Sequence, residues 1–257
     1  LLYFPISYLT KETLGALFIV IIGLILGIGA LTKKKRRNLT KPTIALGLTV
    51  FTIIYIAITL RSSLNIGIRH LFPIIPPLYV LALLGWQQIK EWKYSAWILG
   101  SLVVIHVFAG IQSLPHPLSF YNSLSGGMKY GYLVSADSNY DWGQDINRLK
   151  QWIEAHPEVD TIAVDLFGGS KVETLLGPQS VWWSSAKGNP RSYGIDYIAI
   201  SINNLLNATQ RLENGEPRKA VDSYLWLQEL RKETTVKNLP APDERVGTSI
   251  FIYHLNK

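Results

Sequence analysis

Residues 14–31 read LGALFIVIIGLILGIGAL, eighteen residues without a charged side chain. A helix of this length rises about 27 Å, close to the thickness of the hydrocarbon layer of a membrane. Its glycines at positions 15, 23, 27 and 29 suit close helix packing, and Gly23 and Gly27 form a GxxxG pair. The stretch could also be a buried helix of a soluble protein, but three similar runs follow it. We therefore predict a membrane-spanning helix.

The three further apolar runs lie at 42–60 (PTIALGLTVFTIIYIAITL), 71–87 (LFPIIPPLYVLALLGWQ) and 94–114 (YSAWILGSLVVIHVFAGIQSL). Pro42 suits the first turn of a helix, where a missing N–H costs nothing. The run at 71–87 carries three prolines in its first half, which predicts a kinked or unwound start. The sequence thus predicts an all-α transmembrane region over residues 1–114 with four spans.

Charge sets the expected orientation of these spans. Residues 1–114 hold 11 Lys and Arg against 2 Asp and Glu, and six of the basic residues lie in the loop 32–41 (TKKKRRNLTK). Basic loops stay in the cytoplasm, so loops 32–41 and 87–93 are expected inside and both chain ends outside. Such a run could also bind nucleic acid, but between two spans it favours an orientation signal. We expect a multi-pass protein of the cytoplasmic membrane with no nucleic-acid partner.

The outer loop 61–77 (RSSLNIGIRHLFPIIPP) carries Arg61, Arg69 and His70 beside the proline-rich start of the third span. Ionisable groups at a membrane boundary are often functional, and an arginine can hold a phosphate with two parallel hydrogen bonds. These three residues are therefore the candidate binding site for a lipid phosphate. The alternative is that the arginines reach lipid headgroups and His70 caps a helix.

Residues 115–257 have the mixed composition of a soluble domain, with 14 Lys and Arg against 16 Asp and Glu. The chain has no cysteine, so disulfides contribute nothing. Strand patterns at 159–169, 194–204 and 248–255 alternate with helical patterns at 142–156 and 218–232, the first of them capped by Asp141. We predict a small extracytoplasmic α/β domain with a mixed or parallel sheet.

Residues 135–145 read SADSNYDWGQD and raise three alternatives: a metal loop, catalytic carboxylates, or a helix cap. An EF-hand needs Gly at position 6 and Glu at position 12, where this chain has Trp142 and Arg148, so that metal site is excluded. A divalent metal in another geometry stays open, and no cofactor or metal ligand is assigned. Capping does not explain Asp137, Asn139 and Gln144, which we expect to face the membrane boundary or a bound ligand.

Three segments in this order carry a family resemblance: NIGIRHLFPIIPPLYVLA, HPLSFYNSLSGG and DSNYDWGQDINRLKQW, over about 65–152. They resemble the C-terminal half of family 39-like membrane glycosyltransferases of the GT-C superfamily, similar to protein O-mannosyltransferases and the RgtA/B/C/D-like group. The closing strand TSIFIYHL also fits, whereas the first sixty residues match only as generic spans.

The resemblance implies an inverting enzyme that moves a sugar from a polyprenyl-phosphate donor to a carbohydrate or protein acceptor outside the membrane. It places the catalytic aspartate in an early outer loop upstream of residue 1, so Asp137, Asp141 and Asp145 are not assigned that role. The chain begins at Leu1 and its only methionine is Met128, so we expect a C-terminal fragment. From the family, Arg69 and His70 are carried over as donor-phosphate contacts.

Two other classes of function remain open. The chain could be a membrane-anchored domain that binds a carbohydrate or peptide without catalysis, with Trp142, Trp182 and Trp183 stacking on sugar rings. It could also be a structural anchor or assembly partner, because four bare spans suit that role equally.

Overall fold

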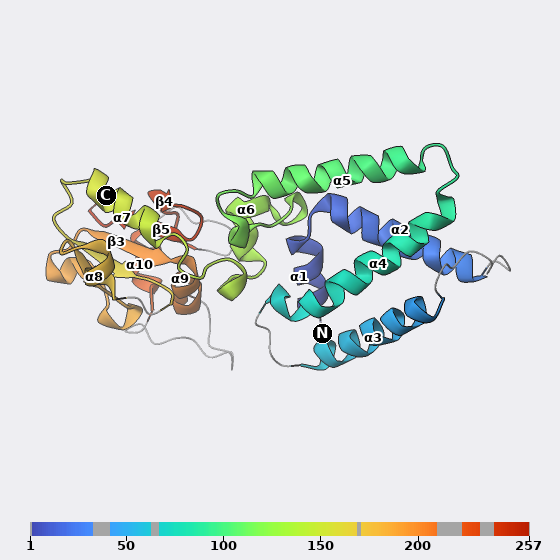
Figure 1. Ribbon diagram of the computed structural model, residues 1–257. Helices are drawn as coiled ribbons and strands as arrows, with labels where there is room; N and C mark the ends of the chain where they lie inside the picture. The colour runs from blue at the N-terminus through green and yellow to red at the C-terminus, as the bar shows by residue number, and fades with distance from the viewer. Residues whose placement is uncertain are drawn as a thin grey trace. The chain divides into compact units, whose positions relative to one another are not determined.

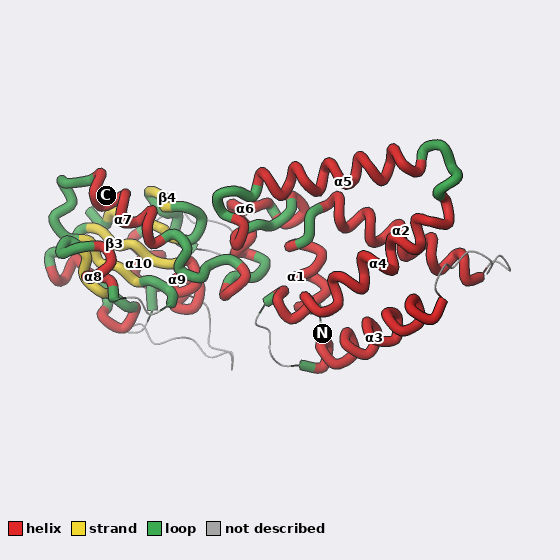
Figure 2. Tube along the Cα trace, viewed as in Figure 1, coloured by secondary structure: helices red, strands yellow, loops and turns green. Residues whose placement is uncertain are grey.

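The computed structural model describes residues 2–32, 42–62, 67–168, 171–209, 223–231 and 239–256 (Figures 1 and 2). The chain divides into two compact units, Leu1–Met128 and Lys129–Lys257. The division lies beyond the predicted end of the transmembrane region at residue 114. One reason is that the segment after the last long helix folds back onto the first unit: Asn122 donates its side-chain amide to the carbonyls of Leu9 and Glu12, at 2.6 and 2.9 Å.

The first unit is helical. Its elements are α1 (Tyr3–Lys11), α2 (Leu14–Thr32), α3 (Pro42–Arg61), the 3-10 helix η2 (Ile68–Ile74), α4 (Ile75–Trp86), η3 (Gln87–Ile89), α5 (Ser95–Gln112), η4 (Pro117–Ser119), η5 (Ser123–Ser125) and the short α6 (Gly127–Tyr130), which runs across the division.

Three stretches of the described chain are long and apolar enough to cross a membrane: Thr43–Arg61, Ile68–Ile89 and Ser95–Gln112. A fourth exists if α1 and α2, which meet at a bend of 118°, form one broken span. These helices indicate a membrane protein, and their positions match the predicted runs. The helix before the bend, α1, was not predicted from the sequence.

Glycines set the close packing of α2 against its neighbours, as the GxxxG pair predicted. A Cβ on Gly23 would lie 2.7 Å from the backbone of Ala82 in α4, and Gly27 faces Gly85 at 3.7 Å. Gly15 faces α5, where a Cβ would lie 2.7 Å from the backbone N of His106. Only residues without a side chain allow the backbones to approach so closely. A Cβ on Gly29, in contrast, would meet no atom of another described element within 4 Å.

The third predicted span begins as the prolines indicated. Pro73 lies inside η2, and α4 starts at Ile75 with proline in its first turn. Proline cannot donate the hydrogen bond that continues an α-helix, so the first turns form a 3-10 helix. Gly67 precedes η2 with φ of 106°, a conformation that favours glycine. The regular α-helix therefore begins only at Ile75, with Pro76 and Pro77 in its first turn.

The second unit is an α/β domain around one five-stranded sheet in the order β2-β1-β3-β5-β4 (Figure 2). β1 pairs in parallel with β2 and β3, whereas β5 pairs antiparallel with β3 and β4, so the sheet is mixed. The elements are η6 (Gly131–Leu133), η7 (Asp137–Asn139), α7 (Ile146–Ala155), β1 (Ile162–Asp165), α8 (Val172–Leu176), β2 (Ser180–Trp182), η8 (Ser185–Lys187), η9 (Pro190–Tyr193), β3 (Tyr197–Ser201), α9 (Ile202–Thr209), α10 (Leu225–Leu230), β4 (Glu244–Val246) and β5 (Ile250–His254).

Leu149 and Ile153 of α7 pack with the buried faces of β1 and β5 into one hydrophobic core. Their spacing of four residues puts them on one face of the helix, which is the periodicity seen in the sequence. The start of this helix was predicted wrongly: α7 begins at Ile146, not near Trp142. Most of the predicted helix 218–232 lies outside the described residues, which contain α10 alone.

Candidate functional site

The three predicted phosphate-binding residues lie at one end of the first unit. Arg61 is the last residue of α3 and is exposed, and Arg69 is exposed on η2. His70, half-buried, accepts a hydrogen bond at its carbonyl from the Tyr55 hydroxyl (2.8 Å). Its ring packs edge-on against Phe4 of α1, with centroids 6.1 Å apart. The η2 segment is thus anchored to both α3 and α1.

An apolar cavity of about 210 Å³ lies between α1, α3 and the η2–α4 segment. It is lined by Phe4, Pro5, Tyr8, Ile56, Thr59, Leu60, Leu71, Ile74 and Leu78. Two lining residues adjoin the predicted basic site in the chain, because Leu60 precedes Arg61 and Leu71 follows His70. An apolar cavity bordered by cationic residues suits an amphiphile with an anionic head.

The elbow between α1 and α2 is held by residues far away in sequence. Lys11 donates from Nζ to the carbonyl of Leu118 (2.7 Å) and lies 4.4 Å from the centre of the Tyr121 ring. Thr13 Oγ1 and the Nδ1 of His106 in α5 are 2.7 Å apart. Together with the Asn122 bonds described above, these contacts fix the C-terminal end of α1.

Glu12 lies in the same elbow and its carboxylate is engaged on two sides. Oε1 accepts the backbone N–H of Thr13 (3.1 Å), and the Tyr79 hydroxyl donates to the carboxylate. Tyr8 is one turn before Glu12 and interacts electrostatically with its carboxylate. The buried Tyr8 hydroxyl has no hydrogen-bond partner among the described residues. No local pattern in the sequence indicates this elbow, because it depends on contacts between residues more than ninety positions apart.

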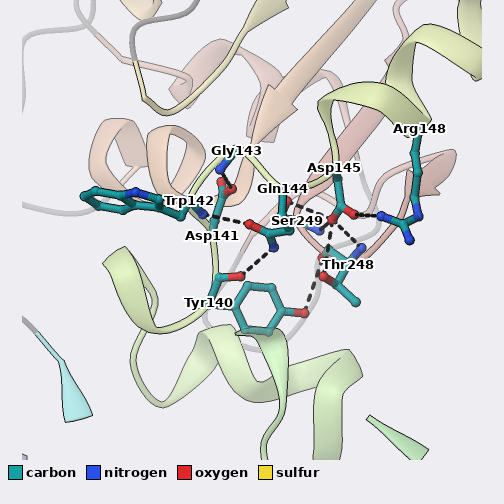
Figure 3. A network of polar contacts seen from close by, with 9 residues as sticks. All are labelled: Tyr140, Asp141, Trp142, Gly143, Gln144, Asp145, Arg148, Thr248 and Ser249. Carbon is teal, nitrogen blue, oxygen red and sulfur yellow. Dashed lines mark hydrogen bonds and ion pairs between the residues drawn. The ribbon is translucent and has the colours of Figure 1, made fainter. Parts of the chain in front are cut away.

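The polar turn 135–145 belongs to the second unit, where Asp145 is its best-connected residue (Figure 3). Its Oδ2 accepts the backbone N–H groups of Thr248 (2.8 Å) and Ser249 (3.0 Å) and the Ser249 hydroxyl (3.0 Å). Its Oδ1 pairs with Arg148 at 3.0 Å. Asp145 occupies the N-cap position of α7, but its side chain makes no cap bond. It ties the β4–β5 turn to the start of α7 instead.

Asp141 is also fully buried, and it is not the helix cap that was predicted. Its Oδ1 accepts the N–H of Gly143 (3.0 Å), which closes a local turn, while Oδ2 has no hydrogen-bond partner among the described residues. Burial, with a smaller effect of the nearby Asp145 charge, raises the pKa of this carboxyl to about 6, although its hydrogen bond from the Gly143 N–H acts in the opposite direction. Asp141 therefore exchanges its proton near neutral pH.

The three residues that capping did not explain have different environments. Gln144 spans the turn, with Oε1 accepting the N–H of Trp142 (2.8 Å) and Nε2 donating to the carbonyl of Tyr140 (3.0 Å; Figure 3). Asn139 is buried and donates to the hydroxyl of Ser135 at 2.8 Å. Asp137 is exposed, with φ of 43°. Asn139 and Gln144 thus stabilise the turn, and Asp137 presents its carboxylate to solvent.

A third buried carboxylate, that of Asp165, lies where β1 ends. Asp165 accepts hydrogen bonds from the Asn204 amide (2.7 Å) and from the Tyr224 hydroxyl (2.5 Å). Burial raises its pKa, and these two donors oppose that effect. The carboxyl ends of parallel strands are frequent ligand sites, but here both carboxylate oxygens are already bonded within the domain.

The tryptophans proposed for sugar stacking divide into two kinds. Trp183 is buried and donates from Nε1 to the carbonyl of Gly188 at 3.0 Å. Trp142 and Trp182 are 60% and 49% exposed. Lys187 Nζ lies 4.2 Å above the Trp182 ring, so that ring has one face covered. Only Trp142 and Trp182 of the three are therefore accessible to a ligand.

Within the described residues, no three His, Cys, Asp or Glu side chains gather as metal ligands would. The chain matches no protein-family profile, no curated protein sequence and no solved structure.

Proposed function

We propose that the chain is the C-terminal part of an integral membrane glycosyltransferase that uses a polyprenyl-phosphate sugar as donor. The observation that carries the proposal is the apolar cavity whose lining residues Leu60 and Leu71 adjoin Arg61 and His70. A polyprenyl phosphate has the matching chemistry, an apolar chain next to an anionic phosphate. The family that residues 65–152 resemble uses the same class of donor, a polyprenyl-phosphate sugar.

In this proposal the first isoprene units occupy the cavity, and the phosphate is bound by Arg69 and Arg61. Guanidinium groups suit this task because they stay charged and match two phosphate oxygens at once. His70 orients η2 through its carbonyl bond with Tyr55 and its ring contact with Phe4. These residues bind and position the donor, and the proposal leaves the catalytic base to a segment upstream of residue 1.

The proposed topology is four spans in the cytoplasmic membrane, with the α1–α2 pair as one broken span and the α/β domain outside. The basic loop 32–41, most of which lies outside the described residues, supports this orientation through the positive-inside rule. The acceptor is a carbohydrate or a protein on the outer side.

A second function, saccharide binding by the α/β domain without catalysis, is favoured by one observation. Trp142 and Trp182 expose large ring surfaces, and such rings offer an apolar face on which a sugar ring can stack. Trp142→Ala and Trp182→Ala would abolish glycan binding by the whole chain if this were its function. Neither change would affect the binding of a lipid phosphate.

The test is direct binding of farnesyl phosphate, a short polyprenyl phosphate, to the full chain in nanodiscs. We expect saturable binding that survives an excess of phosphatidylglycerol and that weakens about tenfold in Arg69→Ala, the loss expected for a charge-assisted hydrogen-bond pair. Lys90→Ala is the matched control, because Lys90 is exposed in the opposite loop and pairs only with the exposed Glu91 in the described contacts.

Two outcomes would contradict the proposal. Farnesyl phosphate that fails to bind the wild-type chain would remove its basis. Phosphatidylglycerol that displaces farnesyl phosphate with equal affinity would show that the arginines serve ordinary lipid headgroups instead. Sugar transfer by a protein that includes the upstream outer loop would then test the catalytic part of the proposal.

A further inference from the structure

We propose that the turn between α4 and α5, residues 90–94, binds the headgroup of an anionic phospholipid together with Trp97. The turn joins two stretches that are long and apolar enough to cross a membrane, Ile68–Ile89 and Ser95–Gln112 (Figure 1). So short a connection between two spans lies at the surface of the bilayer, where lipid headgroups are its neighbours. This inference concerns a lipid other than the proposed donor, and it requires no sugar transfer.

The aromatic side chains of this segment suit the boundary between lipid and water. Trp97 is 78% exposed, and Trp92 and Tyr94 are each 49% exposed. The rings of Trp92 and Tyr94 have their centroids 5.6 Å apart. Tryptophan and tyrosine gather at membrane surfaces because each has an apolar ring with a polar N–H or hydroxyl. Trp86, in contrast, is buried and donates from Nε1 to the carbonyl of Ile19 (3.0 Å), so its ring stabilises the packing of α4 on α2.

The backbone of the turn brings the exposed rings together. Ile98 donates its backbone N–H to the carbonyl of Tyr94 at 2.9 Å, so Tyr94 already belongs to the first helical turn of α5. Tyr94 and Trp97 are three residues apart and are therefore neighbours on the surface of that turn. Trp92 donates its backbone N–H to the carbonyl of Ile89 (2.9 Å), which closes the other side. Side chains on a turn that is closed by backbone bonds lose little freedom on binding.

Lys93 supplies the positive charge for a phosphate. Its Nζ lies 4.7 Å from the centre of the Tyr94 ring, which holds the ammonium group beside the aromatic side chains. The other lysine of the turn, Lys90, pairs with Glu91 at 3.6 Å. A lysine at the surface of a bilayer attracts anionic lipids more strongly than neutral ones. The ammonium group of Lys93 therefore selects an anionic headgroup.

The remainder of α5 has the opposite character. The sequence contains no Asp, Glu, Lys or Arg between Tyr94 and Gln112, and Val104 and Phe108 are exposed. Such side chains suit the hydrocarbon chains of lipids. Trp97 and Val104 are seven residues apart, which is about 10 Å along a helix. Over this distance the exposed surface changes from aromatic rings with a charge to apolar side chains alone, as a bilayer changes from headgroups to hydrocarbon.

The first measurement locates the turn in the bilayer. The full chain is labelled with fluorotryptophan and studied in nanodiscs by ¹⁹F NMR, and the signals are assigned with Trp92→Phe and Trp97→Phe. We expect both signals to broaden more with a nitroxide on the phospholipid headgroup than with a nitroxide at the end of the lipid chain. Signals that neither nitroxide broadens, or that the chain-end nitroxide broadens more, would overturn the inference.

The second measurement tests the charge of the lipid at the same site. A phosphatidylcholine with a headgroup nitroxide is kept as a minor lipid, while the bulk lipid is changed from phosphatidylcholine to phosphatidylglycerol. Phosphatidylglycerol that binds the turn displaces the nitroxide lipid, so the broadening of the Trp92 signal should fall about two- to fivefold. Lys93→Gln should remove this decrease. Lys90→Gln is the matched control and should keep it, because it removes the same charge from the same turn.

The outcomes separate a lipid site at Lys93 from its alternatives, provided that circular dichroism shows equal helix content in all variants. An equal decrease in wild type and Lys93→Gln would show that the ammonium group does not contact the headgroup. A decrease that Lys90→Gln abolishes as fully as Lys93→Gln would show attraction by the net charge of the turn, without the proposed site. Neither measurement uses farnesyl phosphate, so this inference and the proposed function fail independently of each other.

Discussion

Gly85→Ala tests the helix packing on which the first unit depends. A Cβ at this position would lie 2.7 Å from the carbonyl carbon of Gly23 and 2.9 Å from the backbone N of Gly27, and closer still to the Gly23 oxygen. All three atoms belong to the α2 backbone, so no side-chain rotation relieves the overlap. The two helices must move apart, and overpacking of this kind costs about 1–3 kcal/mol. We expect a loss near the upper end, about 3 kcal/mol.

The assay is equilibrium unfolding of the full chain in detergent micelles titrated with sodium dodecyl sulfate and followed by helical circular dichroism. Gly47→Ala and Gly100→Ala are matched controls, because a Cβ at either position would meet nothing within 4 Å in the described chain. In a helix, alanine in place of glycine adds up to about 1 kcal/mol, so the controls should be neutral or slightly stabilising. A Gly85→Ala variant as stable as these controls would refute the close approach of α2 and α4.

Three further predictions concern the second unit and the elbow. Asp145→Asn should destabilise the chain by about 1–3 kcal/mol, because the hydrogen bonds from Thr248 and Ser249 lose their charged acceptor and Arg148 loses its ion pair. Thermal unfolding will measure this loss, and an equal loss in the exposed control Asp160→Asn would contradict it. The pKa of Asp141 is raised to about 6 in the fold, above the unfolded value near 4, so its stabilising contribution is complete at low pH and is lost as pH rises through 6. Hydrogen exchange of the sheet should therefore be slower at pH 5 than at pH 7.5 after correction for intrinsic rates, by about 1.4 kcal/mol of opening energy, and Asp141→Asn should remove that difference. Asn122→Ala should free the C-terminal end of α1, so that protease cleaves near Leu9 faster than in a Ser123→Ala control; equal cleavage would show that the Asn122 bonds do not hold the elbow.

Much of the first unit was predictable because its signals are local. An uncharged run of eighteen residues, a glycine pair four residues apart and a proline at the start of a helix each act through residues close in sequence. The runs at 14–31, 42–60 and 71–87 correspond to α2, α3 and the η2–α4 segment for that reason. In contrast, α1 was not predicted, because it is short and depends on Asn122.

In the second unit, too, only the elements with a local sequence pattern were predicted. The strands β1, β3 and β5 were predicted from their apolar runs, whereas β2 and β4 have three residues each and little pattern of their own. The start of α7 was placed four residues early because Gly143 adopts φ of 77°, which interrupts the helix after Asp141. The role of Asp145 was also hidden, because its partners Thr248 and Ser249 lie about a hundred residues away.

The candidate site was predictable only in part. Arg61, Arg69 and His70 were identified from their position between two spans, but the cavity beside Leu60 and Leu71 requires α1 as its third wall. The sequence therefore indicated the charged part of the site and not the apolar part.

The most direct test of the central claim is photocrosslinking with a polyprenyl phosphate that carries a diazirine in its first isoprene units. The full chain in nanodiscs is irradiated, and labelled residues are mapped by mass spectrometry with and without excess undecaprenyl phosphate. The account predicts competed labels on the cavity lining, at Ile56, Leu60 and Leu71, and not on the exposed apolar residues Val104 and Phe108 of α5. Labels spread equally over α5 and the cavity, or labels that excess undecaprenyl phosphate does not reduce, would contradict a donor site in this cavity.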